Sequence, residues 1–141
     1  MKKKAKDLTS LSINKLHVRR VMVIDDSYIV RDYVKTALEE KGYFVIEAFD
    51  GVHALTKLEY RNIDLFLVDI QMPKMNGIDF IKTIRKMGIN TPVVVITAGM
   101  TPEERIEVKS LGVRATSTKP FKIENLVRCV ETLLNEKEIT K

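Results

Sequence analysis

The stretch "LFLVDIQMPKMNG", residues 65–77, has the pattern of a buried β-strand that ends abruptly in a turn. Its first four residues are apolar, as in a strand that is buried on both faces of a sheet. The next residue is Asp69, and Pro73 and Gly77 follow soon after, so the strand must end there. A buried strand that finishes on a carboxylate needs a reason, because a buried, unpaired charge is costly.

Three further apolar runs, at 21–24, 44–48 and 93–97, alternate along the chain with stretches of helical spacing. The predicted helices cover 28–40, 51–60, 78–87, a segment that begins at Thr101-Pro102, and 123–135. A fifth strand in "RATST" is predicted from its position more than from its pattern. The alternation predicts an α/β fold, a doubly wound five-stranded parallel sheet with helices on both faces. Its strand order, 2-1-3-4-5, is adopted from the flavodoxin-like class of sheets and is not worked out from this sequence.

The charge is unevenly distributed along the chain. Of 24 basic and 19 acidic residues, seven basic and one acidic lie in residues 1–20, which leaves 17 basic and 18 acidic in residues 21–141. We therefore predict a basic, flexible extension at 1–19, a domain at 20–136 and a short tail at 137–141. Because the surplus charge lies outside the domain, we do not predict nucleic acid as a partner.

The composition favours a globular protein over a membrane or secreted one. With 141 residues, 45% hydrophobic and 30% charged, the chain is typical of a soluble globular protein with one core. No apolar run approaches the roughly 20 residues of a membrane-spanning helix, so we predict no membrane insertion. The lysine-rich start lacks the apolar part of a secretory signal, and Cys129 is the single cysteine. A cytoplasmic location is the prediction, with Cys129 as an inert core thiol.

Polar side chains follow four of the predicted strands, at the sheet edge where doubly wound folds bind ligands. Asp25 and Asp26 follow the first strand, Asp69 ends the third, Thr97 ends the fourth, and Lys119 follows the fifth. Three clustered carboxylates repel one another unless a cation neutralises them. Mg²⁺ prefers oxygen ligands and keeps several waters, which leaves room for phosphate oxygens. These residues predict a site for a hard cation with space for a phosphoryl group.

Each of these residues also has an ordinary structural explanation. Asp25 and Asp26 could cap the following helix, Thr97 could be a plain strand-end hydroxyl, and Lys119 could be a surface lysine. Packing needs alone, however, hardly produce all of them at neighbouring strand ends. Asp64, just before the third strand, is assigned to a turn without a functional role.

Four motifs together resemble the receiver domain of two-component response regulators, especially the single-domain, CheY-like chemotaxis type. They are "VMVIDDS" at 21–27, the stretch at 65–77, "VVVITA" at 93–98 and "TKPF" at 118–121, in the order and spacing of that family. The resemblance covers about residues 19–136. It implies a phosphoacceptor signalling protein, not an enzyme in the usual sense, that assists its own phosphorylation and dephosphorylation.

The resemblance also implies a role for each residue of the site. Asp69 would accept a phosphoryl group from a histidine kinase, Thr97 would hydrogen-bond that group, and Lys119 would pair with its charge. Magnesium would be the cofactor, and its predicted ligands are Asp25, Asp26, Asp69 and the backbone carbonyl of Gln71. The peptide bond between Lys119 and Pro120 is expected to be cis.

Two positions depart from the family pattern. Thr116 stands where family members usually carry Tyr or Phe, a ring that turns inward as the threonine of the site moves. We expect phosphorylation to survive this change and the output to be coupled differently, through Thr97 and the loop that begins at Ala98-Gly99. Gly99 itself stands where many relatives have a larger side chain, which leaves the path of the hydrolytic water less shielded.

The predicted function is a phosphorylation-controlled switch that acts through protein contacts. About five residues follow the last predicted helix, too few for a DNA-binding module. Expected partners are a histidine kinase, a flagellar motor switch or another downstream protein, and a phosphatase. The alternatives are a phosphorelay intermediate that passes its phosphoryl group to a second histidine, and a phosphorylation-independent adaptor that acts through the basic tail. A dehalogenase-type hydrolase is set aside because Gln71 occupies the position of its second aspartate, and no nucleotide-binding glycine motif occurs.

Overall fold

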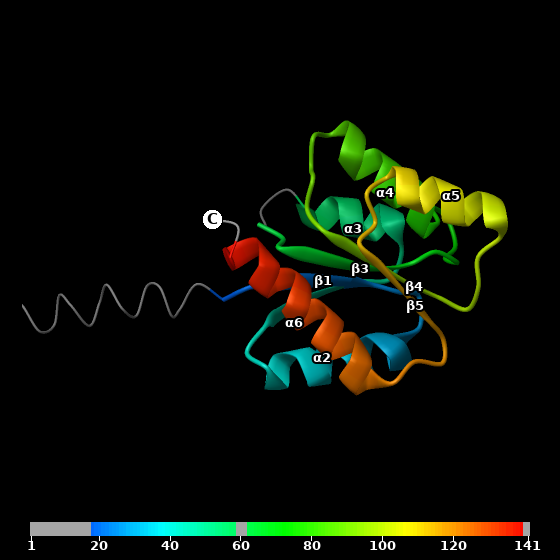
Figure 1. Ribbon diagram of the computed structural model, residues 1–141. Coiled ribbons are helices and arrows are strands. Elements are labelled where there is room, and N and C mark those ends of the chain that lie inside the picture. The colour runs from blue at the N-terminus through cyan, green and yellow to red at the C-terminus, as the bar shows by residue number, and fades with distance from the viewer. Residues whose placement is uncertain (1–17, 59–61, 140–141) are drawn as a thin grey trace, which may run out of the picture.

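The computed structural model describes residues 18–58 and 62–139, the side chains of 136–139 excepted. The predicted extension at 1–19 therefore lies almost wholly outside the described residues. In the described part, five strands alternate with five helices (Figure 1). They are β1 (Arg20–Ile24), α2 (Tyr28–Glu40), β2 (Phe44–Ala48), α3 (Gly51–Leu58), β3 (Leu65–Asp69), α4 (Gly77–Lys86), β4 (Val93–Thr97), α5 (Pro102–Ser110), β5 (Ala115–Thr118) and α6 (Ile123–Ile139). Within these same ranges, no helix combines the length and apolarity needed to cross a bilayer.

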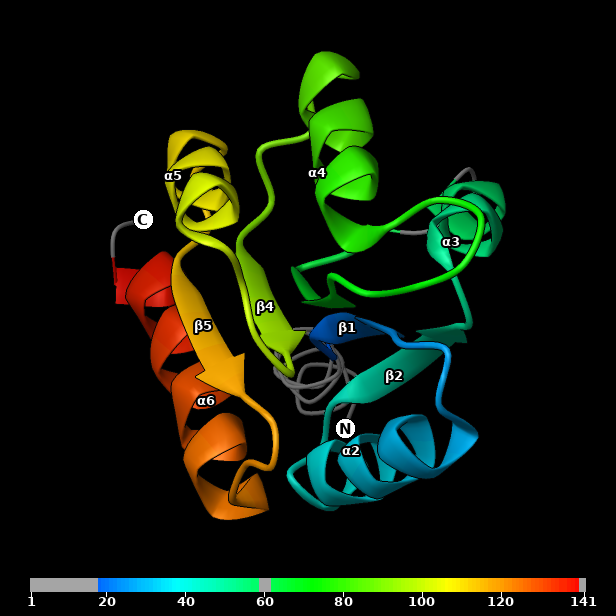
Figure 2. The same ribbon diagram turned by 90° about the vertical axis from the view of Figure 1, so that its right-hand side faces the viewer.

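The five strands form one parallel sheet in the order β2-β1-β3-β4-β5, which confirms the predicted topology. Helices α2 and α6 cover one face, and α3, α4 and α5 cover the other (Figures 1 and 2). Leu65 and Leu67 pack in the core on the side of α2 and α6, whereas Phe66 and Val68 pack in the opposite core. Both faces of β3 are therefore buried, which explains its unbroken apolar run.

The helix limits differ slightly from the predicted ones. Helix α4 begins one residue early, at Gly77, and α6 continues four residues beyond the predicted end, to Ile139. No glycine or proline interrupts the sequence between 123 and 139, so nothing there stops the helix. The predicted end of the second helix at residue 60 lies outside the described residues. Helix α5 begins with a capping box formed by Thr101 and Glu104, with bonds of 3.1 and 2.9 Å.

Gly77 lets the start of α4 approach the end of β3 closely. Its backbone N–H donates to the carbonyl oxygen of Ile70 over 2.9 Å. A Cβ atom at this position would meet the Asp69 carbonyl oxygen and would lie 2.8 Å from Cγ1 of Val68. A larger residue would therefore push directly on the backbone that carries Asp69.

We expect Gly77→Ala to lower the free energy of unfolding by about 3 kcal/mol, because the close approach leaves no room for a methyl group. Gly99→Ala is the matched control: nothing lies within 4 Å of a Cβ there, so its stability should stay within about 1 kcal/mol of wild type. Urea unfolding at neutral pH measures both. Equal stability of the two variants would show that the contact at Gly77 relaxes easily.

Candidate functional site

Three carboxylates converge at the carboxyl edge of the sheet, as predicted. One oxygen from each of Asp25, Asp26 and Asp69 lies within 4.8 Å of the others. Asp25 and Asp69 are buried, with 1% and 4% of their surface exposed, whereas Asp26 is exposed. The convergence follows from the topology, because β1 and β3 are adjacent parallel strands and end at the same edge.

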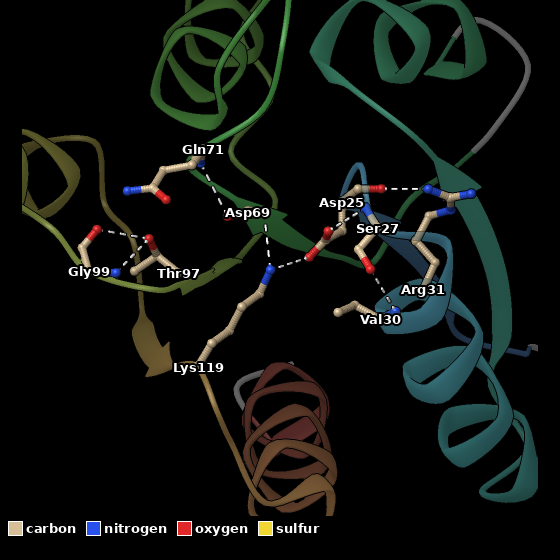
Figure 3. Close-up of polar contacts among 9 residues, drawn as sticks. All are labelled: Asp25, Ser27, Val30, Arg31, Asp69, Gln71, Thr97, Gly99 and Lys119. Carbon is tan, nitrogen blue, oxygen red and sulfur yellow. Dashed lines mark hydrogen bonds and ion pairs between the residues drawn. The ribbon is translucent and has the colours of Figure 1, made fainter.

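Lys119 joins two of these carboxylates (Figure 3). Its Nζ donates to Oδ2 of Asp25 over 2.9 Å and to Oδ2 of Asp69 over 3.2 Å. Its backbone N–H donates to the carbonyl oxygen of Thr97 over 2.8 Å, which ties the loop after β5 to the end of β4. The peptide bond that follows, to Pro120, is cis, as predicted. One ammonium group thus lies between two buried acids, one directly after β1 and the other at the end of β3.

Backbone amides orient the same two carboxylates. Asp25 accepts a 2.8 Å bond from the backbone N–H of Ser27, and its own N–H donates to the carbonyl oxygen of Ala48 over 3.1 Å. Asp69 accepts a 3.2 Å bond from the backbone N–H of Gln71. Each carboxylate therefore accepts a bond from the backbone N–H two residues further along the chain.

Charge repulsion and burial perturb the protonation of the site. Burial raises the pKa of Asp69 above its usual range, and the charge of Asp25 raises it further. Lys119 and the Gln71 amide act in the opposite direction without cancelling this rise. Burial lowers the pKa of Lys119, but its bonds and charge interactions with Asp25 and Asp69 outweigh burial and leave that pKa raised. The lysine is therefore a permanent cation here.

This donor set suits a hard divalent cation. All three side chains offer carboxylate oxygens, the ligand type that Mg²⁺ takes in proteins. The exposed Asp26 lies on the solvent side of the cluster, so waters and phosphate oxygens have access to it. The arrangement can bind a cation and present a carboxylate oxygen to an electrophile that approaches from solvent.

Thr97 ends β4, next to β3, and its hydroxyl is engaged with the following loop. It donates to the carbonyl oxygen of Gly99 over 2.9 Å and accepts from the backbone N–H of Gly99 over 3.2 Å. The residue is buried, with 1% of its surface exposed. Any group that bonded this hydroxyl would therefore have to compete with the loop.

The response regulator receiver domain family matches residues 21–131, more than half of the chain. The chain belongs to this family. The match includes the three carboxylates, Thr97 and Lys119.

Individual relatives of this receiver come from different systems. The transcriptional regulatory protein DltR of Streptococcus agalactiae is 32% identical over 108 residues, 77% of this chain and 48% of DltR. The chain thus spans about half the length of curated relatives such as DltR. The structure of the chemotaxis protein CheY4 of Vibrio cholerae is 32% identical, with a TM-score of 0.77 over 82% of this chain and 98% of CheY4. The response regulator TrrA of Thermotoga maritima, solved in complex with Mg²⁺-BeF, is 30% identical, with a TM-score of 0.72 over 82% of this chain and 99% of TrrA.

Thr116, the first departure from the family pattern, lies on the edge strand β5. Thr116 pairs with Val95 across the edge of the sheet and is exposed. It lines a groove of about 240 Å³ between α5 and β5, together with Met100 and Val108 among others. In this receiver, the edge strand carries a short hydroxyl side chain where the family usually places a ring.

Asp64, His53 and Cys129 take no part in the carboxylate cluster. Asp64 lies at the opposite edge of the sheet, where its carboxylate accepts a 2.8 Å bond from the backbone N–H of Arg20. His53 accepts a 3.1 Å bond from the N–H of Phe49 and stacks on its ring, and His17 lies outside the described residues. Cys129 packs beside the core, and burial raises the pKa of its thiol.

One residue in contact with the site was missed by the sequence analysis. Arg31, one turn into α2, donates from Nη1 to the carbonyl oxygen of Asp25 over 2.7 Å. Its place four residues after the cap Ser27 puts it on the helix face above the turn, which is the only signal that the sequence offers.

The raised pKa of Asp69 predicts how stability depends on pH in metal-free buffer. Because this pKa is higher in the folded state than in the unfolded chain, the folded state binds the proton more readily between the two values. The free energy of unfolding should therefore fall as pH rises from the ordinary carboxyl range through the raised pKa. Asp69→Asn should lack this fall and be more stable than wild type at neutral pH. Denaturant unfolding in a chelator, over a pH series, measures both.

The exposed Asp32 of α2 provides the control for this pH series. Asp32→Asn should keep the pH dependence of wild type. If Asp69→Asn kept it as well, the carboxyl group of Asp69 would not be its source.

Proposed function

We propose that Asp69 accepts a phosphoryl group from a histidine kinase and that this modification changes which proteins the receiver binds. The observation that supports this most directly is the position of the Lys119 ammonium, within hydrogen-bond distance of both Asp69 and Asp25. A cation beside a carboxylate nucleophile stabilises the charge that arrives with a phosphoryl group.

In the proposed transfer, a carboxylate oxygen of Asp69 attacks the phosphorus of a phosphohistidine. An O–P bond forms as the P–N bond breaks, and the imidazole leaves with the electron pair and takes up a proton. The chain contributes mainly position and charge. The Gln71 amide orients the carboxylate, and Lys119, which stays protonated, faces the added negative charge.

Asp25, Asp26, Asp69 and the backbone carbonyl of Gln71 are the residues that would hold Mg²⁺. The ion, when bound, neutralises charge on the carboxylates and on the phosphoryl oxygens. Asp26 is exposed and is the acid best placed to keep solvent within the coordination shell.

We further propose that Thr97 carries the signal away from the site. Its hydroxyl bonds both backbone groups of Gly99, so turning it toward a phosphoryl oxygen would release the loop that starts at Ala98. That loop leads directly into α5, which begins at Pro102. The route needs no aromatic ring and is compatible with Thr116 in β5.

For the output, we propose control of a flagellar motor in chemotaxis, within the cytoplasm. The similarity to CheY4 supports this, because it extends over 98% of a protein that is named for chemotaxis. Regulation of transcription, suggested by the name of DltR, is the competing output. A motor switch protein or another downstream protein would then be the partner that recognises the phosphorylated receiver.

The test of the acceptor is mass spectrometry of the intact protein after incubation with acetyl phosphate and Mg²⁺. Wild type should gain a single phosphoryl adduct, and Asp69→Asn should gain none, because an amide oxygen is not a usable nucleophile here. Asp64→Asn is the matched control: it removes a carboxylate that lies just before the other end of β3 and should leave the adduct unchanged. An adduct that persisted in Asp69→Asn would overturn the assignment.

A further inference from the structure

A second set of contacts supports the turn between β1 and α2, on the side away from Lys119. Residues 25–27 lie after the end of β1 and before the start of α2, outside any regular element. They carry two of the three carboxylates of the site, and like charges so close together repel one another. The pairing of β1 with β2 ends at Ile24, and one further backbone bond, from the N–H of Asp25 to the carbonyl oxygen of Ala48, ties the start of this turn to the sheet. Other contacts must therefore hold the Asp25 carbonyl and the two carboxylates in place.

The side chain of Arg31 reaches this turn. Its Nη1 donates to the carbonyl oxygen of Asp25 over 2.7 Å, and Figure 3 shows that the guanidinium lies on the opposite side of Asp25 from Lys119. Its Nε donates to a carboxylate oxygen of Glu47 over 3.2 Å. The Arg31 side chain is only 15% exposed, so the bridge is largely shielded from solvent. One planar group thus bonds the turn and the edge strand β2 at once.

Glu47 is itself anchored on two sides. Its carboxylate pairs with Lys35 over 3.4 Å, and its carbonyl oxygen accepts a 2.6 Å bond from Nζ of Lys57 in α3. The ring of Tyr28 lies 5.9 Å from the guanidinium of Arg31, a distance at which cation and ring attract. Arg31 therefore links the Asp25 carbonyl to Glu47, a residue of β2 that is itself held in place.

From this geometry we propose that Arg31 is a positioning residue: by clamping the Asp25 carbonyl to β2, it sets the Asp25 and Asp26 carboxylates for binding of a divalent cation. The inference rests on the proposed function, since it assumes that these acids bind Mg²⁺. Residues that orient metal ligands from behind typically change metal affinity by about 10-fold to 100-fold when they are removed.

Whether Mg²⁺ binds more weakly or more tightly after Arg31 is replaced distinguishes a positioning role of Arg31 from a simple effect of its charge. Arg31 is a cation near a cation site, so its charge alone opposes Mg²⁺, and deleting that charge would tighten binding. If Arg31 acts by position, its removal weakens binding in spite of the lost repulsion. Lys35 is the matched control, because it pairs with the same Glu47 from the same helix and its described bonds do not reach Asp25.

The experiment is an NMR titration of amide signals with MgCl₂ in wild type, Arg31→Gln, Arg31→Lys and Lys35→Gln. Signals of residues 25–27 report binding, and core signals of β3 and β4 report that each variant is folded. We expect Arg31→Gln to raise the dissociation constant for Mg²⁺ roughly tenfold and Lys35→Gln to leave it unchanged or slightly lower. Arg31→Lys should fall between wild type and Arg31→Gln, because a single ammonium cannot bond Asp25 and Glu47 with the same fork.

Each other outcome overturns the inference. Unchanged or tighter binding in Arg31→Gln would show that Arg31 does not position the acids. Equal weakening in Arg31→Gln and Lys35→Gln would show that the effect runs through Glu47 alone. If wild type showed no response to Mg²⁺, the proposed function would fail and the inference with it, whereas a wild-type response that Arg31→Gln shares would refute the inference alone.

Discussion

The ammonium group of Lys119 between two buried carboxylates is the interaction on which the rest of the site depends. Asp25 and Asp69 come from adjacent strands that end at one edge, so the topology itself forces like charges together. Without a cation, this proximity would favour protonation of one acid. Burial first, and the charge of Asp25 second, keep the pKa of Asp69 raised even beside Lys119. A site with residual repulsion is one that a divalent cation and a phosphoryl group can still improve.

The sheet could be predicted from the sequence because its burial is regular. Both faces of β3 and β4 are covered, and an unbroken run of four apolar residues in each strand reflects this directly. The edge strand β5 was predicted only from its position, and its burial explains why. Its four residues alternate between half-buried and exposed, so packing places little demand on their side chains.

The convergence of the three carboxylates and Lys119 could be predicted for a related reason. Residues that follow the strands of a parallel sheet meet at one edge, whatever the details of packing. Contacts made by long side chains could not be predicted in this way. Arg85 donates to the carbonyl oxygens of Leu111, Ile89 and Thr91 over 2.8, 3.0 and 2.8 Å, and nothing in the spacing of these residues indicates that they meet. These bonds depend on how the loop before β4 and the loop after α5 lie relative to α4, and the local sequence does not encode this arrangement.

The carboxylates of Asp69 and Asp25 also differ in what fixes their positions, the sheet for one and contacts of a turn for the other. Asp69 is the last residue of β3, where the ladder pairs it with Ile96 and Gly77 packs against its backbone. Asp25 lies one residue beyond β1. Its backbone N–H still bonds the carbonyl oxygen of Ala48, but its carboxylate and its carbonyl oxygen are held by Ser27 and Arg31. Repulsion between the acids therefore acts on Asp69, which lies within a strand, and on Asp25, which depends more on contacts of the turn. Adjustment of the site to a bound cation should consequently occur mainly in the β1–α2 turn, while the acceptor Asp69 keeps its place in the strand.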